Sequence, residues 1–273
     1  MKCLICNSST SFYFSKTYTK HFSELMAGIG EVHYWKCDNC GFVLSKTHAE
    51  LGKKAWQKLN NDFHHHIENL SNSKIINQPP YAEQAMMLAM LSGNGIIGTA
   101  TMLDYAGGYG TLGKLLKKYH GIDLPIHDPY VTASDSKDYV QKENLTTYQT
   151  VVNSAMFEHV LTRADLDQVN QLVDDGGALV LHTVICENIP QDPDWFYLVP
   201  PVHTAFHTNK SMGILMQQWG YASSIYCPPS KCWVLLKNKN AEQIRHQCDS
   251  LNLELQNEWF HFKVGFVDYW KGF

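Results

Sequence analysis

The sequence has no excess of basic residues, no apolar run long enough to cross a bilayer, no internal repeat and no low-complexity segment. Its 22 Lys and Arg residues stand against 26 Asp and Glu residues, which gives a formal net charge of -4 over 273 residues. Proteins whose main partner is nucleic acid usually carry a basic face and often a basic pI. The charge balance therefore argues against a nucleic-acid partner and favours a small-molecule substrate.

Segments that would direct the chain to a membrane are also missing. The first ten residues, MKCLICNSST, lack the apolar h-region of a signal peptide. The most apolar helical stretch, AEQAMMLAMLSG, is shorter than the roughly 20 residues that span a hydrocarbon core. We therefore expect a cytoplasmic protein with no membrane span. Because thiols stay reduced in that compartment, the eight cysteines are expected to be metal ligands or core residues.

Four of these cysteines form two CxxC pairs near the start of the chain, CLIC and CDNC. Each pair places two thiols on a tight turn, and two such knuckles can give zinc a tetrahedral set of four sulfurs. We therefore predict a structural zinc ion, with no open coordination position, in a small N-terminal zinc-knuckle module. The expected ligands are Cys3, Cys6, Cys37 and Cys40. The other cysteines lack ligand spacing and are expected in the core: Cys186, Cys227, Cys232 and Cys248.

From about residue 100 to residue 240 the sequence alternates between strand-like and helical patterns. TMLDYAG, YQTVVNSA and GALVLHTV are typical of buried strands. TLGKLLKKYHG and RADLDQVNQLVDDGG are typical of amphipathic helices, the second of them ended by its glycines. Such alternation predicts an α/β fold with a doubly wound, mainly parallel sheet that is covered on both faces. YASSIYC and KCWVLLKN are separated by a short turn, which predicts an antiparallel hairpin at one edge.

The segment MLDYAGGYGTLG, which begins at Met102, places three glycines within four positions. A glycine inside a regular element costs roughly 0.5–1 kcal/mol relative to alanine, so three together need a reason. A strand, a glycine-rich turn and a helix let the backbone approach a ligand closely. The glycines alone would fit a dinucleotide equally well.

DYAGGYG resembles the first motif of class I S-adenosylmethionine-dependent methyltransferases, D/E-x-G-x-G-x-G. Asp104 takes the acidic position, and Gly108 and Gly110 take the second and third glycine positions. Ala106 stands where the first glycine usually does. The resemblance implies that these four residues form the wall of a site for S-adenosylmethionine.

The resemblance continues along the chain in the order of the family's motifs. HDP places Asp128 where these enzymes carry a carboxylate that binds the ribose hydroxyls. VVNSAMFEHV resembles the fourth-strand segment, and Asn153 within it is assigned to the cofactor site. LVDDGGALVLHT and HTAFHTNKSMGILMQQWGY resemble the two segments that follow. Since the stretch between Asp128 and the fourth strand is short, SDSKDYVQKENLTTY must supply a helix and a third strand in reduced form.

A Rossmann-like methyltransferase domain over residues 81–240 is what the resemblance implies. The chain would then divide into a zinc-binding module over residues 1–49, a helical linker over 50–80, this domain, and a helical and aromatic extension over 241–273.

Methyl transfer to a hydroxyl or an acidic carbon needs a group that removes a proton, and histidine is the natural base near neutral pH. Three histidines follow the predicted fourth and fifth strands, at the carboxyl edge where open α/β sheets bind ligands. His203 is the first candidate, because it matches the histidine of the family's H-x-x-x-[FY] segment. His207 and His159 come next. His203 could instead only fix its loop, and His159 could only position the helix beside the cofactor.

Two further patterns leave alternatives open. His64, His65 and His66 are consecutive, so on a helix they point in three directions. They form a solvated face, or one of them reaches over the pocket. The aromatic residues 195–197 could form a wall for the acceptor or pack onto their own domain.

A zinc-knuckle module ahead of this domain is similar to bacterial sugar and natural-product methyltransferases. It implies a sugar, a nucleotide-sugar or a natural product as acceptor, methylated at oxygen or carbon. Two other functions remain open at this point. One is an RNA methyltransferase whose zinc module binds RNA, and the other is a non-catalytic protein that binds S-adenosylmethionine.

Overall fold

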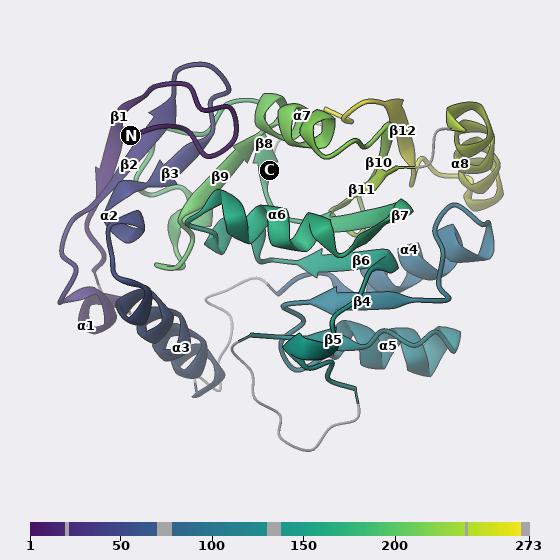
Figure 1. Ribbon diagram of the computed structural model, residues 1–273, viewed down its shortest axis with the longest axis horizontal. Coiled ribbons are helices and arrows are strands. Elements are labelled where there is room, and N and C mark those ends of the chain that lie inside the picture. Colours follow the sequence, from purple (N-terminus) through teal and green to yellow (C-terminus); the bar gives the residue numbers. More distant parts are fainter. Residues whose placement is uncertain (20–21, 70–77, 130–137, 238–239, 269–273) are drawn as a thin grey trace. The chain divides into compact units, whose positions relative to one another are not determined.

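The computed structural model describes residues 1–19, 22–69, 78–129, 138–237 and 240–268 (Figure 1). The chain forms two compact units. Unit 1 consists of Met1–Gln78, Glu158–Asp165 and Val184–Ile214, and unit 2 consists of Pro79–Phe157, Leu166–Thr183 and Leu215–Phe273. This division differs from the four expected segments, because two later pieces of the chain join the N-terminal module and the C-terminal extension belongs to unit 2.

Unit 1 is built on a five-stranded sheet with the order β1-β2-β3-β9-β8. The first four strands pair antiparallel, and β8 pairs parallel with β9. Val43 of β3 lies opposite Phe206 of β9, so strands more than 150 residues apart in sequence share one sheet. The strands are β1 (Thr10–Lys16), β2 (Val32–Cys37), β3 (Val43–Ser45), β8 (Ile185–Cys186) and β9 (Ala205–Thr208).

An aromatic core holds unit 1 together. The ring of Tyr34 stacks on Phe14 with centroids 4.8 Å apart and lies 5.6 Å from the ring of Phe206. Helix α3 (Lys53–Asn69) adds buried side chains at Leu59 and Phe63, which are four residues apart and therefore lie on one face. The shorter helices are α1 (Ser23–Met26), α2 (Lys46–Ala49), η4 (Phe157–His159), which begins at the last residue of unit 2, and η5 (Phe196–Leu198).

Unit 2 contains a seven-stranded sheet with the order β12-β10-β11-β7-β6-β4-β5 (Figure 1). Strands β7, β6, β4 and β5 run parallel, and β11, β10 and β12 are attached by antiparallel pairing. The expected α/β fold with a Rossmann-like sheet and an antiparallel hairpin is confirmed, and β12 lies outside that hairpin. The bounds are β4 (Met102–Tyr105), β5 (Ile126–His127), β6 (Tyr148–Ser154), β7 (Val173–His182), β10 (Ser223–Cys227), β11 (Cys232–Leu236) and β12 (His261–Val264).

Helices α4 (Tyr81–Gly93), α5 (Thr111–His120) and α8 (Ala241–Leu255) share one hydrophobic core with the strands of this sheet. Buried side chains of these helices, such as Met87 and Leu116, pack in the same cluster as Val180 and Val234 of the sheet. The remaining helices are α6 (Arg163–Gln171), α7 (Asn209–Gln218) and the short η3 (Lys142–Asn144).

One local expectation changed. Helix α6 ends at Gln171, and the acidic and glycine residues after it belong to strand β7 instead of ending the helix. The segment expected to supply a third strand in reduced form contributes, among its described residues, one parallel bridge between Tyr139 and Ile126. Part of the segment expected to supply it, residues 130–137, lies outside the described residues, as do residues 70–77 of the expected linker.

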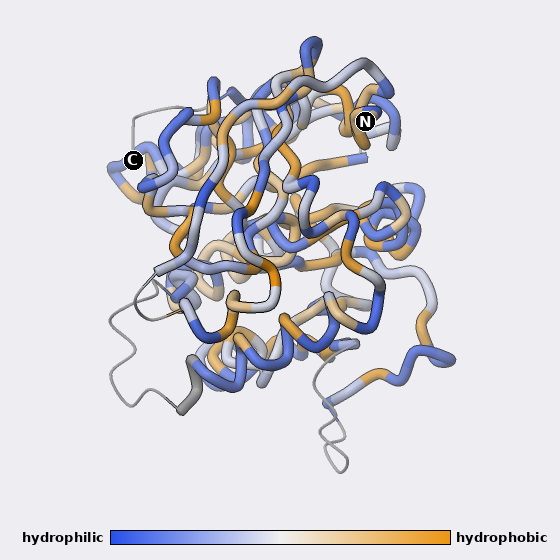
Figure 2. Tube along the Cα trace, turned by 90° about the vertical axis from the view of Figure 1, so that its left-hand side faces the viewer, coloured by the Kyte–Doolittle hydropathy of each residue, from blue (hydrophilic) through white to orange (hydrophobic). Residues whose placement is uncertain are grey.

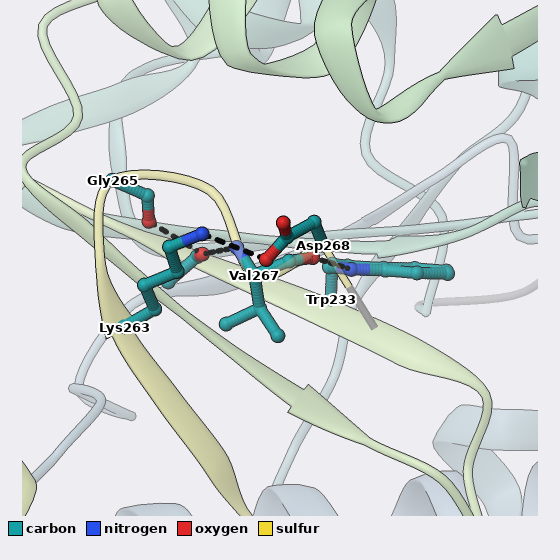
Figure 3. A network of polar contacts seen from close by, with 6 residues as sticks. Trp233, Lys263, Gly265, Val267 and Asp268 are labelled. Carbon is teal, nitrogen blue, oxygen red and sulfur yellow. Dashed lines mark hydrogen bonds and ion pairs between the residues drawn. The ribbon is translucent and has the colours of Figure 1, made fainter. Parts of the chain in front are cut away.

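The C-terminal segment is tied to the sheet by a small polar network (Figure 3). The indole Nε1 of Trp233 donates to the carbonyl of Val267 at 3.0 Å, and the backbone N–H of Val267 donates to Ser224 Oγ at 2.8 Å. Ser224 Oγ in turn donates to the carbonyl of Gly265 at 2.8 Å. These bonds satisfy backbone groups that would otherwise be buried without partners, and they hold the chain that follows β12 against β10 and β11.

None of the described helices is long and apolar enough to cross a membrane. In Figure 2 the hydrophobic stretches of the chain are short and alternate with hydrophilic ones.

Candidate active site

The turn between β4 and α5 in unit 2 is shaped by left-handed backbone. Ala106, Gly108 and Gly110 have φ angles of 61°, 54° and 72°. A residue with a Cβ pays roughly 1–2 kcal/mol in this region, so the left-handed conformation of Ala106 has a cost that a glycine would not have. A Cβ on Gly107 would lie 2.5 Å from Asp104 Oδ2, whereas a Cβ on Gly108 would meet no described protein atom within 4 Å. The space beside Gly108 is therefore open to a ligand.

Asp104 is the third residue of β4, just before this turn, and is almost fully buried, with 2% of its surface exposed. Its Oδ1 atom has no hydrogen-bond partner among the described residues. Burial, together with the negative charge of Asp128, raises the pKa of Asp104 to about 7. A buried carboxyl oxygen without a partner is costly, so this atom is suited to accept a hydrogen bond from a bound ligand.

The raised pKa of Asp104 predicts a pH dependence of stability. Because its folded pKa lies above the unfolded value of 3.8, this group stabilises the protein below about pH 4 and loses that contribution as the pH rises toward 7. The full contribution is on the order of 4 kcal/mol. Urea unfolding of wild type and Asp104→Asn at pH 4.5 and pH 7.5 should show a smaller pH dependence in the variant. Equal slopes in both proteins would contradict the burial argument.

Asp128 and Tyr139 hold the middle of the glycine turn. Asp128 Oδ2 accepts a hydrogen bond from the backbone N–H of Gly108 at 2.9 Å, and Tyr139 Oη donates to the carbonyl of Gly108 at 2.6 Å. The carboxylate that the sequence assigns to the ribose hydroxyls is thus fixed beside the open space at Gly108.

Two more buried polar groups belong to this region. Asn153 at the end of β6 donates through Nδ2 to the carbonyl of Tyr105 at 2.8 Å, and its Oδ1 has no partner among the described residues. Gln84 of α4 accepts through Oε1 from Ser154 Oγ at 3.2 Å, while its Nε2 is likewise without a partner there. The acceptors Asp104 Oδ1 and Asn153 Oδ1 and the donor Gln84 Nε2 are therefore suited to form hydrogen bonds with a bound ligand. S-adenosylmethionine carries an ammonium group, a carboxylate and ribose hydroxyls, so the residues present fit it.

Unit 1 brings together four cysteine sulfurs that all lie within 4.8 Å of one another. The Sγ atoms of Cys3 and Cys40 are 3.6 Å apart, and those of Cys6 and Cys37 are 3.4 Å apart. Four sulfurs at about 2.3 Å from a tetrahedral zinc ion would be separated by about 3.8 Å. The cluster therefore matches the size of a four-sulfur metal site.

The two knuckles have the same backbone geometry. The N–H of Asn7 donates to the carbonyl of Cys3 at 3.0 Å, and the N–H of Gly41 donates to the carbonyl of Cys37 at 3.1 Å. Asn7 and Gly41 both have left-handed φ angles, of 59° and 73°. Each turn also directs one backbone N–H to the first sulfur of its pair, from Ile5 and Cys40 respectively. These backbone hydrogen bonds turn each knuckle so that its two sulfurs lie on the same side of the turn as those of the other knuckle.

A second cluster in unit 1 contains Glu158, His159 and His203, whose ligand atoms lie within 4.8 Å of one another. The rings of His159 and His203 are perpendicular, with centroids 5.0 Å apart. His203 Nδ1 lies 2.7 Å from the carbonyl oxygen of Tyr197, and because that oxygen can only accept, Nδ1 carries the proton and Nε2 the lone pair. Burial lowers the pKa of His203 to about 4 and holds the pKa of His159 well below its usual value. Both imidazoles are therefore neutral at pH 7.

A model of the methyltransferase domain matches residues 63–223 of this chain. The chain belongs to the methyltransferase domain family. With its α/β sheet and glycine turn, it is a class I S-adenosylmethionine-dependent methyltransferase. No curated protein matches this methyltransferase in sequence.

Several solved structures are similar to it at low sequence identity. A plantazolicin methyltransferase solved with a desmethyl-plantazolicin analogue and S-adenosylhomocysteine has 9% identity and a TM-score of 0.44, covering 68% of this chain and 94% of that one. Magnesium protoporphyrin IX methyltransferase from Synechocystis PCC 6803 has 12% identity and a TM-score of 0.42, covering 66% and 95%. A putative O-methyltransferase from Nostoc punctiforme PCC 73102 has 14% identity and a TM-score of 0.39, covering 70% and 72%.

The three candidate bases of the methyltransferase lie in unit 1, but only two of them belong to the same side-chain cluster. His159 and His203 share one cluster, whereas His207 lies in β9, fully buried, with its ring 5.0 Å from Phe42. His64 is exposed on α3, and its ring lies 6.1 Å from His159. The structure shows His64, His65 and His66 on an exposed face of α3, with His64 near the cluster of Glu158, His159 and His203.

The aromatic residues after β8 pack largely on their own unit. The ring of Trp195 lies 5.4 Å from Phe206, and the ring of Tyr197 lies 4.5 Å from His203. Phe196 is 47% exposed. Trp195 and Tyr197 therefore support the core and the His203 ring, which favours the packing interpretation for these two.

Three polar residues at these sites were not predicted from the sequence. Gln84 could have been noticed as a polar side chain inside an otherwise apolar helix, AEQAMMLAM. Glu158 stands directly before the candidate base His159 in VVNSAMFEHV, and this position is the signal that could have found it. Tyr139 follows a stretch with no motif, and no local signal points to it.

Proposed function

We propose that this methyltransferase transfers the methyl group of S-adenosylmethionine to a small-molecule acceptor in the cytoplasm, at an oxygen or a carbon atom. The acceptor class that we favour is a sugar, a nucleotide-linked sugar or a related natural product. Support for a small acceptor comes from the net charge of -4, which does not suit a polyanionic substrate.

The observation that carries the proposal is the set of buried polar atoms without partners around the glycine turn. We assign Asp104 and Asn153 to the cofactor's ammonium end, since each has a buried acceptor oxygen. Gln84, whose Nε2 is a buried donor, is assigned to the cofactor's carboxylate. Asp128 is assigned to the ribose hydroxyls, and the turn from Ala106 to Gly110 provides the backbone wall. The bound cofactor would supply an electrophilic methyl group on its sulfonium.

For the acceptor we propose the cluster of Glu158, His159 and His203. A hydroxyl or acidic carbon loses a proton during methyl transfer, and His203 remains the first candidate for the base that accepts it. Its Nδ1–H bond to the Tyr197 carbonyl fixes the ring and leaves Nε2 as the hydrogen-bond acceptor.

We propose a structural role for zinc, bound by Cys3, Cys6, Cys37 and Cys40. Four protein sulfurs complete a tetrahedral shell, so this ion would stabilise unit 1 and would leave no position for a substrate.

The assignment of Asp128 predicts a loss of cofactor affinity. Asp128→Ala should weaken binding of S-adenosylmethionine by about 10- to 150-fold, because hydrogen bonds to a charged group contribute roughly 1.5–3 kcal/mol. Isothermal titration calorimetry measures this directly. Tyr139→Phe is the matched control, since it removes the other hydrogen bond to Gly108 without touching the carboxylate.

A loss of similar size in Tyr139→Phe would mean that Asp128 acts only by holding the turn. Unchanged affinity in Asp128→Ala would show that the second motif has been misplaced.

A further inference from the structure

We infer that Glu158, His159 and His203 form a second metal site, distinct from the four-cysteine cluster, for a divalent transition-metal ion. The inference concerns binding by this cluster and does not rest on the proposed methyl transfer. Its first support is geometric, because one carboxylate oxygen and two imidazole nitrogens already lie within 4.8 Å of one another. Ligands of one ion at about 2.1 Å from it are separated by about 3.0–3.4 Å, so small side-chain rotations would close the set.

The second support is the orientation of the imidazoles. Histidines that bind metals usually donate their other ring N–H to a carbonyl or carboxylate, which fixes the tautomer. His203 does so through Nδ1–H and the Tyr197 carbonyl, so Nε2 is available as the ligand atom. The Nδ1 atom of His159 is buried and has no hydrogen-bond partner in the described part of the chain.

The third support is the carboxylate. Glu158 is only 2% exposed, which is unusual for a glutamate and suits a side chain that binds a cation. The carbonyl of Glu158 also accepts a hydrogen bond from the N–H of Thr204 at 2.7 Å. That bond joins the segment carrying Glu158 and His159 to the segment carrying His203. The three ligands are thus held by one short piece of backbone pairing within unit 1.

The donor set defines the kind of ion. Two imidazoles and one carboxylate suit Zn²⁺, Fe²⁺, Mn²⁺ or Co²⁺, and three protein ligands leave positions open for water or for an oxygen of a substrate. The four-sulfur cluster offers no such positions. The ring of His64 on α3 lies 6.1 Å from that of His159. An ion there would occupy the lone pair of His203, so metal binding and proton uptake by that nitrogen exclude each other.

Cobalt provides a probe that distinguishes the two sites. Full-length protein with its cysteine site loaded with zinc would be dialysed against increasing Co²⁺, with bound metal determined by elemental analysis. We expect one additional ion per chain, with weak visible absorption and without the strong sulfur-to-cobalt charge-transfer bands of a thiolate site. Zinc-loaded protein that takes up no cobalt at millimolar concentration would overturn the inference.

Variants locate the ion. Glu158→Gln keeps the size of the side chain, and His203→Ala removes the imidazole. Each of these two single variants should weaken cobalt binding by at least about 100-fold, since even partners of metal ligands contribute about 10- to 100-fold. His65→Ala is the matched control, because it removes an exposed histidine next to His64. Equal losses in the control would assign the ion to surface histidines and contradict the site. Far-ultraviolet circular dichroism confirms folding, and cobalt binding retained in folded Glu158→Gln and His203→Ala would also contradict it.

Discussion

Purified protein is expected to keep one zinc ion per chain after dialysis against EDTA, and Cys40→Ser is expected to lose both the ion and the fold of unit 1. The four sulfurs already lie at nearly the spacing of a tetrahedral zinc shell, with pairs 3.4 and 3.6 Å apart. Binding of structural zinc is worth about 10–16 kcal/mol, which is as large as the whole stability of a typical domain. Loss of one ligand should therefore expose unit 1 to proteolysis.

Elemental analysis and limited proteolysis measure this effect. Cys248→Ala serves as the control, because Cys248 is a fully buried thiol of α8 in unit 2. The control should keep its zinc and its resistance to protease near residues 1–49. Wild-type protein without zinc, whose four N-terminal thiols react with an alkylating agent while the protein remains folded, would refute the zinc assignment.

Removal of the His203 ring is expected to lower methyl-transfer turnover by about 10²- to 10⁴-fold, the range typical of a group that handles a transferred proton. Affinity for S-adenosylmethionine should stay within about threefold of wild type, because the proposed cofactor residues are others. The assay uses radiolabelled methyl transfer to any acceptor that the wild-type enzyme methylates in a screen, with calorimetry for the cofactor.

His207→Gln provides the comparison for this experiment. His207 is fully buried in β9 beside Phe42, outside the cluster of Glu158, so its replacement should reduce stability more than turnover of the folded fraction. A His203→Ala enzyme with normal stability and full activity would remove His203 from the reaction and return His159 and His207 to consideration.

Elements with a strong local signal could be predicted from the sequence. The strand before the glycine turn, the helix after it and the hairpin of β10 and β11 all occur where periodicity and turn residues place them. The two CxxC pairs come together as expected. Each knuckle needs only local geometry, and the long segment between them needs only to bring the second pair back to the first. Ala106 adopts a left-handed backbone, as Gly108 and Gly110 do, so the turn forms despite the departure from the motif.

What the sequence could not supply depends on pairing between distant segments. The pairing of β9 with β3 puts His203 and His207 in the same compact unit as the cysteines, and no periodicity encodes such a long-range register. The same applies to β12, whose pairing with β10 makes the C-terminal segment a part of the sheet of unit 2. The sequence predicts a helix end at the glycines near the start of β7, because a helix stop and a strand with small residues have similar composition.

Calorimetric titration with S-adenosylmethionine, in wild type and in one pair of glycine variants, tests most directly whether the glycine turn is a cofactor site. A Cβ added at Gly108 would enter the open space beside Asp128. Gly176 in β7 is the control, because a Cβ added there also meets no atom within 4 Å but lies outside the glycine turn, at a residue without a left-handed φ angle. We predict saturable one-to-one binding in wild type and Gly176→Val, and no detectable binding in folded Gly108→Val. Wild-type protein that is folded and zinc-loaded but releases no heat of binding, or a Gly108→Val variant that binds as well as wild type, would contradict the account.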